Sequence, residues 1–452
     1  MTETLNEEKF SKKLLRIMLP ISGQSLIAAS LNFVDTLMVG RLGEAEIAAV
    51  GFSVQFTFIF WMVLFGFTGG TITYMAQFFG KGDLLNIRRV MGIAVTVSFL
   101  TGAAFFCLCF FSPVTVLRIY TNIPEIIEMG IPFLKLIAFV FLTWSIVVPM
   151  TAALRATQQT GLPFKISIVV FSLNTALCVL LINGFLGMPR MGILGAATAT
   201  VISRCLELVI YLIVIFGRKN ILAGPLRQFF SWSRDLWKRV IMNSIPTTAN
   251  EALWGLGTSM YMAAYGRMGV AEAAAVQAGN TIFNLFSLAC FAVGDAMLIL
   301  CGEKLGQGKT EEAFELAKRI LKVGVRIALV AGGLLIASSS FIVKAFRFTE
   351  QGLFFMTMIL IVYGCMLCIK VYTAAVVTGA LRSGGDTRVG MLLDIGTVWC
   401  IGVPLAFFGA LVLHLPVFLV VAMVHTEEIV KLFLMRWRFN SRIWVRNLVR
   451  DL

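Results

Sequence analysis

Two segments of the sequence repeat one another without a gap, and this repeat limits the fold more than any other feature. Residues 19–51 and 245–277 align at an offset of 226 positions, and nine residues then meet an identical residue. The same offset takes Gly80 onto Gly306, and an offset of 227 takes Arg155 onto Arg382. The chain therefore consists of two homologous halves in tandem.

The composition places these halves in a membrane. Apolar residues make up 58% of the chain and charged residues 14%, and the mean hydropathy is +0.88. Apolar runs of about 20 residues, the length of a bilayer-spanning helix, follow one another from end to end. We predict an all-α integral membrane protein with about twelve spanning helices, six per half, at residues 15–40, 46–72, 88–113, 124–152, 163–186, 191–217, 239–265, 272–300, 320–345, 350–380, 388–411 and 415–436.

An even number of helices per half gives the two bundles the same orientation. Their pseudo-symmetry axis then lies along the membrane normal, and a central cleft is expected between them. We expect an N-terminal lobe at residues 1–218, a cytoplasmic amphipathic linker at 219–238 and a C-terminal lobe at 239–452 with a basic tail. The charged residues 1–13 lead directly into the first apolar run, so no cleavable signal peptide is expected.

The basic residues lie in alternate connections. The net charge is +14, and it gathers at the N-terminus, in the linker and in the tail. This distribution indicates a multi-pass protein of the cytoplasmic membrane with both termini in the cytoplasm, and it does not suggest nucleic-acid binding. Aromatic and basic residues alternate in the linker and tail, which predicts amphipathic helices in contact with membrane lipid.

Charged side chains within spanning helices mark function by default. Asp35 lies deep in the first helix beside Asn32, and Glu251 opens the second half, five residues past Pro246 on the equivalent helix. A carboxylate in this setting can carry a proton, or bind sodium with help from neighbouring oxygens. Asn174 of the fifth helix and Thr200 of the sixth would supply such oxygens, although packing between helices is the ordinary role of such residues.

Other polar residues in the spanning helices are weaker candidates for the lining of the cleft. Asp295 and Lys370 would either face the cleft or pair with each other. Asn280 and Tyr372 complete the set of candidates. Glu427 and Glu428 stand one turn before Lys431, and we expect them to neutralise it.

Signs of an enzyme are missing from the sequence. The segment GEKLGQGKT at 302–310 lacks the first glycine of a phosphate-binding loop, and no strand precedes it. Neither HExxH nor GxSxG occurs. We therefore expect transport driven by an ion gradient, with no cofactor. An intramembrane aspartyl protease using Asp295 and Asp394 is a distant alternative.

Six motifs taken in order resemble the multidrug and toxic compound extrusion (MATE) family of cation-coupled antiporters. They are VDTLMVGRLG, AQFFGKGD, ALRATQQTGLP, NEALWGLG, GEKLGQGKTEEA and GALRSGGDTR, and they span almost the whole chain. The resemblance implies two six-helix lobes arranged in a V. It also implies a cation and substrate site at Asp35 and Asn174, a bending proline at Pro20, and a cation-binding glutamate at Glu251.

The chain departs from the family pattern at two places. Cys178 stands where one branch has an aspartate, and the tenth helix carries Lys370 and Tyr372 where another branch has an acidic residue. Proton and sodium coupling therefore both stay open, with sodium placed at Asp35 and Asn174 or at Glu251.

We expect an exporter of amphipathic organic cations that works by antiport against protons or sodium, as a monomer. The alternative is a lipid-linked oligosaccharide flippase. Its anionic cargo would need several basic residues in the cleft, whereas most candidate cleft charges here are acidic.

Overall fold

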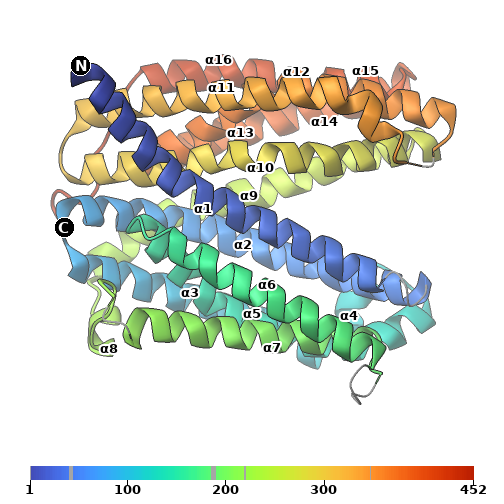
Figure 1. The fold of residues 1–452 in the computed structure, drawn as a ribbon, viewed down its shortest axis with the longest axis horizontal. Coiled ribbons are helices and arrows are strands. Elements are labelled where there is room, and N and C mark those ends of the chain that lie inside the picture. The colour runs from blue at the N-terminus through green and yellow to red at the C-terminus, as the bar shows by residue number, and fades with distance from the viewer. Residues whose placement is uncertain (1, 40–43, 185–189, 218–219, 347) are drawn as a thin grey trace. The chain divides into compact units, whose positions relative to one another are not determined.

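The computed structural model describes residues 2–39, 44–184, 190–217, 220–346 and 348–452. Within these ranges the side chains of residues 2–9, 32–37, 39, 44–48, 183 and 289 fall outside the description. Every regular element in the described ranges is helical, and they contain no strand (Figure 1). The predicted all-α class is confirmed.

The first half contains six long helical stretches. They are α1 (Thr2–Val39), α2 (Glu44–Lys81), α3 (Leu84–Phe111), α5 (Pro124–Ala156), α6 (Gly161–Asn183) and α7 (Ile193–Leu212), the last continued by a π-helical turn at Ile213–Gly217. Two short helices, α4 (Pro113–Arg118) and α8 (Leu226–Phe229), lie in the connections.

The second half repeats this count. Its long stretches are α9 (Arg234–Gly266), α10 (Val270–Gly306), α11 (Thr310–Val343), α12 (Glu350–Ala374) with a π-helical turn at Ala375–Leu381, α13 (Thr387–Thr397) continued through α14 (Val403–Phe407) to Val412, and α15 (Val417–Val424) followed by α16 (Thr426–Asn440). The predicted twelve stretches are therefore present among the described residues.

Nine of these stretches are long and apolar enough to cross a membrane, and α10 makes a tenth if its two parts count as one span. The α9 and α15–α16 stretches do not meet this criterion. Polar residues interrupt α9 between Asn243 and Glu251, and α16 contains acidic and basic residues that pair inside the protein. A count based on hydropathy alone therefore gives fewer membrane-spanning helices than the twelve expected from two repeats of six helices.

Several helices are longer than their apolar cores. The helix α1 starts at Thr2, α2 runs to Lys81 and α11 starts at Thr310, whereas the predicted spans began or ended about ten residues nearer the apolar centre. The extra turns of α1 and α11 are rich in charged residues, whereas those of α2 are mostly buried and apolar. The helices therefore extend beyond the predicted spans at these ends.

The chain divides into two compact units, and three helices cross the division. One unit comprises Met1–Ser22, Ala76–Gly82 and Met242–Leu452, and the other comprises Gly23–Met75 and Asp83–Ile241. The start of α1 and the last turns of α2 thus belong with the second half of the sequence. The predicted lobe limits at 218 and 239 stay a prediction.

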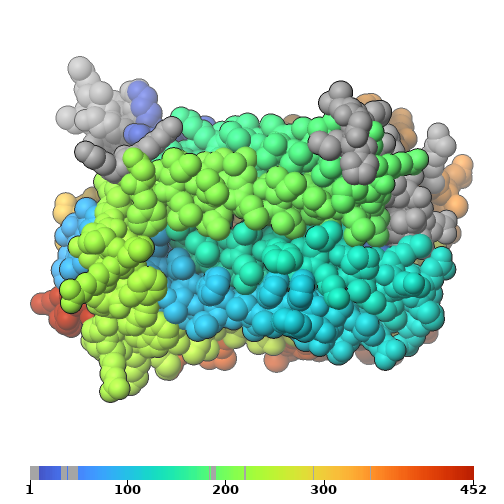
Figure 2. All heavy atoms as spheres, turned by 90° about the horizontal axis from the view of Figure 1, so that it is seen from below, coloured from blue at the N-terminus to red at the C-terminus, as the bar shows by residue number. Residues whose placement is uncertain are grey.

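Each unit has its own apolar core. In the C-terminal unit α10, α11 and α12 pack on one another around buried Val293, Leu300 and Ile320. In the N-terminal unit α5 packs on both α3 and α7, and the outer face of these helices is seen in Figure 2. A cluster around Phe60, Leu134 and Phe141 fills part of its interior.

The linker between the halves is not the single amphipathic helix that was predicted. Only Leu226–Phe229 is helical before α9 begins at Arg234. Phe229 is buried, and the Arg88 guanidinium of α3 donates to the carbonyl oxygens of Ile221 and Leu222 at 3.0 and 3.3 Å. These contacts hold the linker on α3 in an irregular conformation.

The C-terminal tail also differs from the predicted amphipathic helix. Regular helix ends at Asn440, and the residues that follow form turns and irregular chain. Trp444 and Val449 are fully buried. Because these apolar side chains are buried within the protein, they leave no continuous apolar face for lipid.

Candidate cation-binding site

The candidate site of the first half begins on α1. Pro20 lies inside this helix, and the division between the compact units follows at Ser22 and Gly23. A proline in a helix interior removes a backbone hydrogen bond and favours bending there. Asp35 and Asn32 also lie on α1, but their side chains are outside the described residues.

Asn174 is buried on α6 with only 1% of its surface exposed. Its Nδ2 donates to Cys178 Sγ one turn further on, at 3.7 Å. Thr200 lies on α7, which packs on α6, and its Oγ1 donates to the Ala196 carbonyl at 3.0 Å. Asn174 and Thr200 therefore lie on neighbouring helices, and the hydroxyl proton of Thr200 is used within its own helix.

An arginine at the end of α5 binds α1 in the same unit. Arg155 Nη2 donates to Gln24 Oε1 at 2.5 Å. The contact joins residues separated by 131 positions and lies about one helical turn after Pro20. It fixes the described part of α1 just after its proline.

The second half contains a charged counterpart of this contact. Arg382 Nη2 forms an ion pair with Glu251 Oε1. The side chains are 4% and 14% exposed respectively, so the pair lies in the interior. An offset of 227 takes Arg155 onto Arg382, whereas the offset of 226 in the first helices takes Gln24 onto Asn250, one residue before Glu251. Equivalent arginines thus contact the first helix of each half at adjacent rather than identical positions, through an amide in the first half and a carboxylate in the second.

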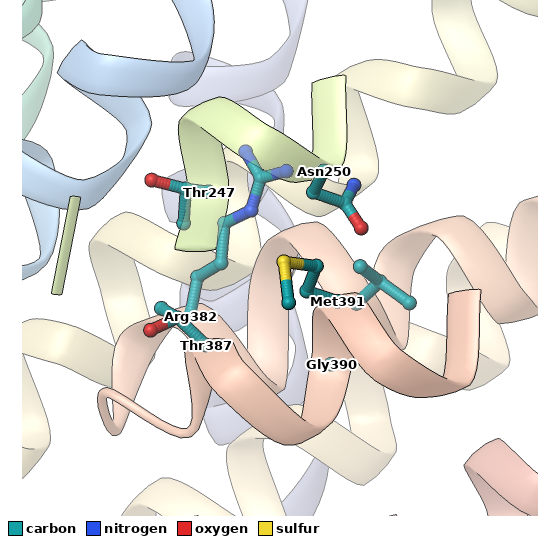
Figure 3. A pocket seen from close by; sticks show the side chains of 7 residues that line it. Thr247, Asn250, Arg382, Thr387, Gly390 and Met391 are labelled. Carbon is teal, nitrogen blue, oxygen red and sulfur yellow. The ribbon is translucent and has the colours of Figure 1, made fainter. Parts of the chain in front are cut away.

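A small cavity adjoins Arg382. Its volume is about 10 Å³, and Thr247, Asn250, Val377, Arg382, Thr387, Gly390 and Met391 line it. Figure 3 shows Arg382 reaching from the α12–α13 connection towards α9, where its guanidinium lies between Thr247 and Asn250. The space suits one water-sized group. Asn250 Oδ1, which is buried without a hydrogen-bond partner, would accept from such a group.

Asn250 also leads into a network of buried charges. Its Nδ2 donates to Asp394 Oδ2 at 3.1 Å, and Asp394 Oδ1 pairs with Lys431 Nζ at 2.9 Å. Lys431 lies 3.3 Å from Glu428 Oε1, whose other oxygen accepts from Thr373 at 2.8 Å. The network connects α9, α13, α16 and α12 through groups that each have a partner.

The expected roles of the two glutamates of α16 hold only in part. Glu428 does pair with Lys431, but Lys431 lies nearer to Asp394. Glu427 instead accepts a hydrogen bond at 2.5 Å from the Tyr261 hydroxyl of α9. Lys431 therefore forms its ion pairs with Asp394 and Glu428, whereas the hydrogen bond of Glu427 goes to a neighbouring helix.

The weaker candidates lie in separate places within the second half. Asn280 of α10 accepts a hydrogen bond from the Tyr363 hydroxyl at 2.7 Å. The Lys370 ammonium lies over the Phe283 ring, 5.1 Å from its centroid. Asp295, on α10, and Tyr372, on α12, are both partly exposed. The contacts described for Asn280 and Lys370 are thus with Tyr363 and Phe283.

The sequence contained one signal for these arginine contacts that the predictions did not use. Arg155 and Arg382 appeared only as markers of the repeat, and Gln24, Asn250 and Tyr261 were not singled out. The feature that identifies these contacts is a pair of equivalent arginines, one after the fourth helix and one after the tenth. Each arginine faces a polar residue on the first helix of its half.

A sodium ion does not fit at Glu251 while the Arg382 pair stands. The guanidinium occupies the carboxylate and carries the charge that a bound cation would supply. In the first half Asn174 offers an oxygen, but Cys178 beside it offers a sulfur, which suits soft metals better than a hard cation.

Two homologous sets of apolar helices with carboxylates inside them define a multi-pass membrane transporter. The MatE family model matches the chain twice, at residues 20–180 and at residues 246–408. The two matches cover the two halves of the repeat and more than half of the chain. The chain therefore belongs to the MATE family, whose members are transporters and not enzymes.

Individual relatives resemble the chain along most of its length. A probable multidrug resistance protein, YoeA of Bacillus subtilis, is 23% identical over 86% of this chain and 85% of its own. The probable multidrug resistance protein NorM of Thermotoga maritima is 24% identical over 88% and 85%. A MATE transporter structure from Vibrio cholerae has a TM-score of 0.87 and 16% identity, and covers 97% of this chain and 99% of that one.

Proposed function

We propose that this chain is a multidrug exporter of the cytoplasmic membrane that exchanges amphipathic organic cations for protons or sodium. The match of the MatE family model to both halves carries the proposal, and the relatives named for multidrug resistance support it. Those relatives give no support to the oligosaccharide flippase. Basic residues concentrated in the linker and tail support cytoplasmic termini.

Coupling is assigned to Asp35 rather than to Glu251. Glu251 already holds a guanidinium that cannot lose its charge, so an external cation gains little from binding there. Asp35 shares the first half with Asn174 and Thr200, and its helix contains Pro20. Arrival of a proton or sodium ion at Asp35 would release the organic cation, since one carboxylate cannot neutralise both ligands at once.

Each carboxylate has a defined effect in this scheme. Asp35→Asn removes the charge for which drug and coupling ion compete, and we expect it to abolish uphill export. Glu251→Gln replaces the ion pair with an arginine–amide contact of the kind that Arg155 makes with Gln24, and we expect it to retain export at a reduced rate. Glu125→Gln changes an exposed carboxylate of α5 and serves as the control.

The test is export of ethidium from proteoliposomes, with a pH jump and a sodium jump imposed separately. Wild-type export under one gradient, its loss in Asp35→Asn and its persistence in Glu125→Gln are expected. Wild-type rates in Asp35→Asn would show that this carboxylate does not couple transport. Co-purified polyprenyl pyrophosphate together with absent ethidium export would favour the flippase.

A further inference from the structure

The last turns of α2 and α10 cross at a contact that the sequence repeat makes symmetrical. The offset of 226 takes Gln77 onto Glu303 and Gly80 onto Gly306. A Cβ atom on Gly80 would lie 1.9 Å from the Glu303 carbonyl oxygen, and one on Gly306 would lie 1.8 Å from the Gln77 carbonyl oxygen. The two helices therefore touch backbone to backbone, and each repeat supplies one of the two glycines.

The C-terminal tail covers this crossing, and Gln77 is the residue that binds it. The Gln77 side chain is fully buried. Its Nε2 donates to the carbonyl oxygens of Ser383 at 2.7 Å and Arg446 at 3.1 Å, and its Oε1 accepts from the Leu448 N–H at 2.7 Å. One amide of α2 thus joins the α12–α13 turn to two residues of the tail.

Further contacts attach the tail on both sides of Gln77. Lys81 Nζ, at the end of α2, donates to the Val449 carbonyl at 2.9 Å. Asn447 Nδ2 donates to the Gly306 carbonyl at 3.5 Å. Trp444 is fully buried against the Phe439 ring, with centroids 5.5 Å apart. The tail is therefore a packed part of the C-terminal unit.

We propose that residues 442–452, which we call the strap, close the end of the transporter that carries the C-terminus, and that Gln77 is the positioning residue that holds the strap. Most of α2 belongs to the N-terminal unit, but Ala76–Gly82 belongs to the unit that holds the strap. An opening that moves the end of α2 away from α10 and from the α12–α13 turn breaks the contacts of Gln77 with Ser383, Arg446 and Leu448, so strap release accompanies such an opening. This inference rests on the proposed function, which requires the site to open to the cytoplasm.

The first test is tryptic cleavage after Arg446 in the full-length protein in lipid nanodiscs. Arg446 has an exposed side chain, but its carbonyl is held by Gln77. Gln77→Glu places an oxygen against two carbonyl oxygens, and Gln77→Met removes all three hydrogen bonds without adding charge. We expect cleavage to accelerate about tenfold in either variant, which corresponds to about 1.4 kcal/mol.

The second test separates a gate from a merely structural cover. Ala76 is fully buried at the crossing, and a Cβ atom on Gly302 would lie 2.8 Å from the Ala76 Cβ. Maleimide labelling of the thiol introduced by Ala76→Cys, read by peptide mass spectrometry, reports whether the crossing opens. We expect labelling about tenfold faster when Gln77→Met is combined with it.

Glu303→Gln is the matched control, because this residue occupies the equivalent position on α10 and its side chain pairs with Lys13 at 2.8 Å. It should change neither cleavage nor labelling. Faster cleavage with unchanged labelling would show that the strap is only a structural cover, and would overturn the proposal. Unchanged cleavage in both Gln77 variants would also overturn it. Neither readout needs a transported substrate, so a failure of the proposed function would be seen separately, in the ethidium assay.

Discussion

The buried pair of Arg382 and Glu251 makes a quantitative prediction about the stability of the C-terminal unit. With side chains 4% and 14% exposed, the pair belongs to the buried class, in which loss of one partner costs about 3–5 kcal/mol. Arg382→Met leaves the Glu251 carboxylate in the interior without its guanidinium, so a loss in that range is expected. For a unit of this size, this is a fall of about 6–20 °C in the unfolding temperature.

Glu251→Gln should cost much less. The first half holds Arg155, the equivalent of Arg382, against the Gln24 amide at 2.5 Å, which shows that an arginine at this position accepts an amide as its partner. We expect about 1 kcal/mol for this change. The double variant should cost little more than Glu251→Gln alone, so the coupling energy would be close to the full cost of Arg382→Met, about 3–5 kcal/mol.

The measurement is thermal and denaturant unfolding in detergent, followed by tryptophan fluorescence, for both single variants and the double variant. Arg155→Met is measured alongside, because it removes the equivalent guanidinium from its contact with the Gln24 amide. Additivity of the two Arg382 and Glu251 substitutions within about 0.5 kcal/mol would refute the reasoning. Such a result would mean that the two groups do not depend on one another.

Three further changes test other parts of the structure. Gly306→Ala places a Cβ atom 1.8 Å from the Gln77 carbonyl oxygen, and we expect an unfolding temperature lower by about 5 °C or more; an unchanged value would contradict the backbone contact. Tyr261→Phe removes the 2.5 Å hydrogen bond to Glu427, which should lower the free energy of unfolding by denaturant by about 1.5–3 kcal/mol. An unchanged free energy of unfolding would mean that Glu427 does not accept this hydrogen bond. Pro20→Ala restores a missing helix hydrogen bond, so it should raise the unfolding temperature. It should also slow ethidium export about tenfold, because bending α1 costs more free energy without the proline. Export at the wild-type rate would show that Pro20 has no role in transport.

The linker and the tail show where sequence patterns mislead. Alternating aromatic and basic residues are typical of helices at a membrane surface, yet here Phe229 and Trp444 are buried in the protein. The same alternation serves packing when the neighbouring helices offer a groove and free carbonyl groups. Local sequence does not contain that information, because the groove is made by distant residues.

The sequence by itself determined the architecture, because two signals that are read along the chain, hydropathy and the internal repeat, are enough to define it. Apolar runs of spanning length set the helices, and the 226-residue repeat set their division into equivalent halves. The repeat even marked Gly80 and Gly306, whose shared crossing needs a glycine from each half. Hydropathy and repetition are read along the chain and need no knowledge of neighbours.

Only the tertiary structure decided which charges meet. The partner of Glu251 lies 131 positions away along the chain. Lys431 forms an ion pair with Asp394 of another helix rather than with Glu427 of its own helix. A buried charge is stabilised by whichever opposite group the packing brings within hydrogen-bond reach. That choice depends on the rotation and depth of several helices at once, which no single segment of the sequence specifies.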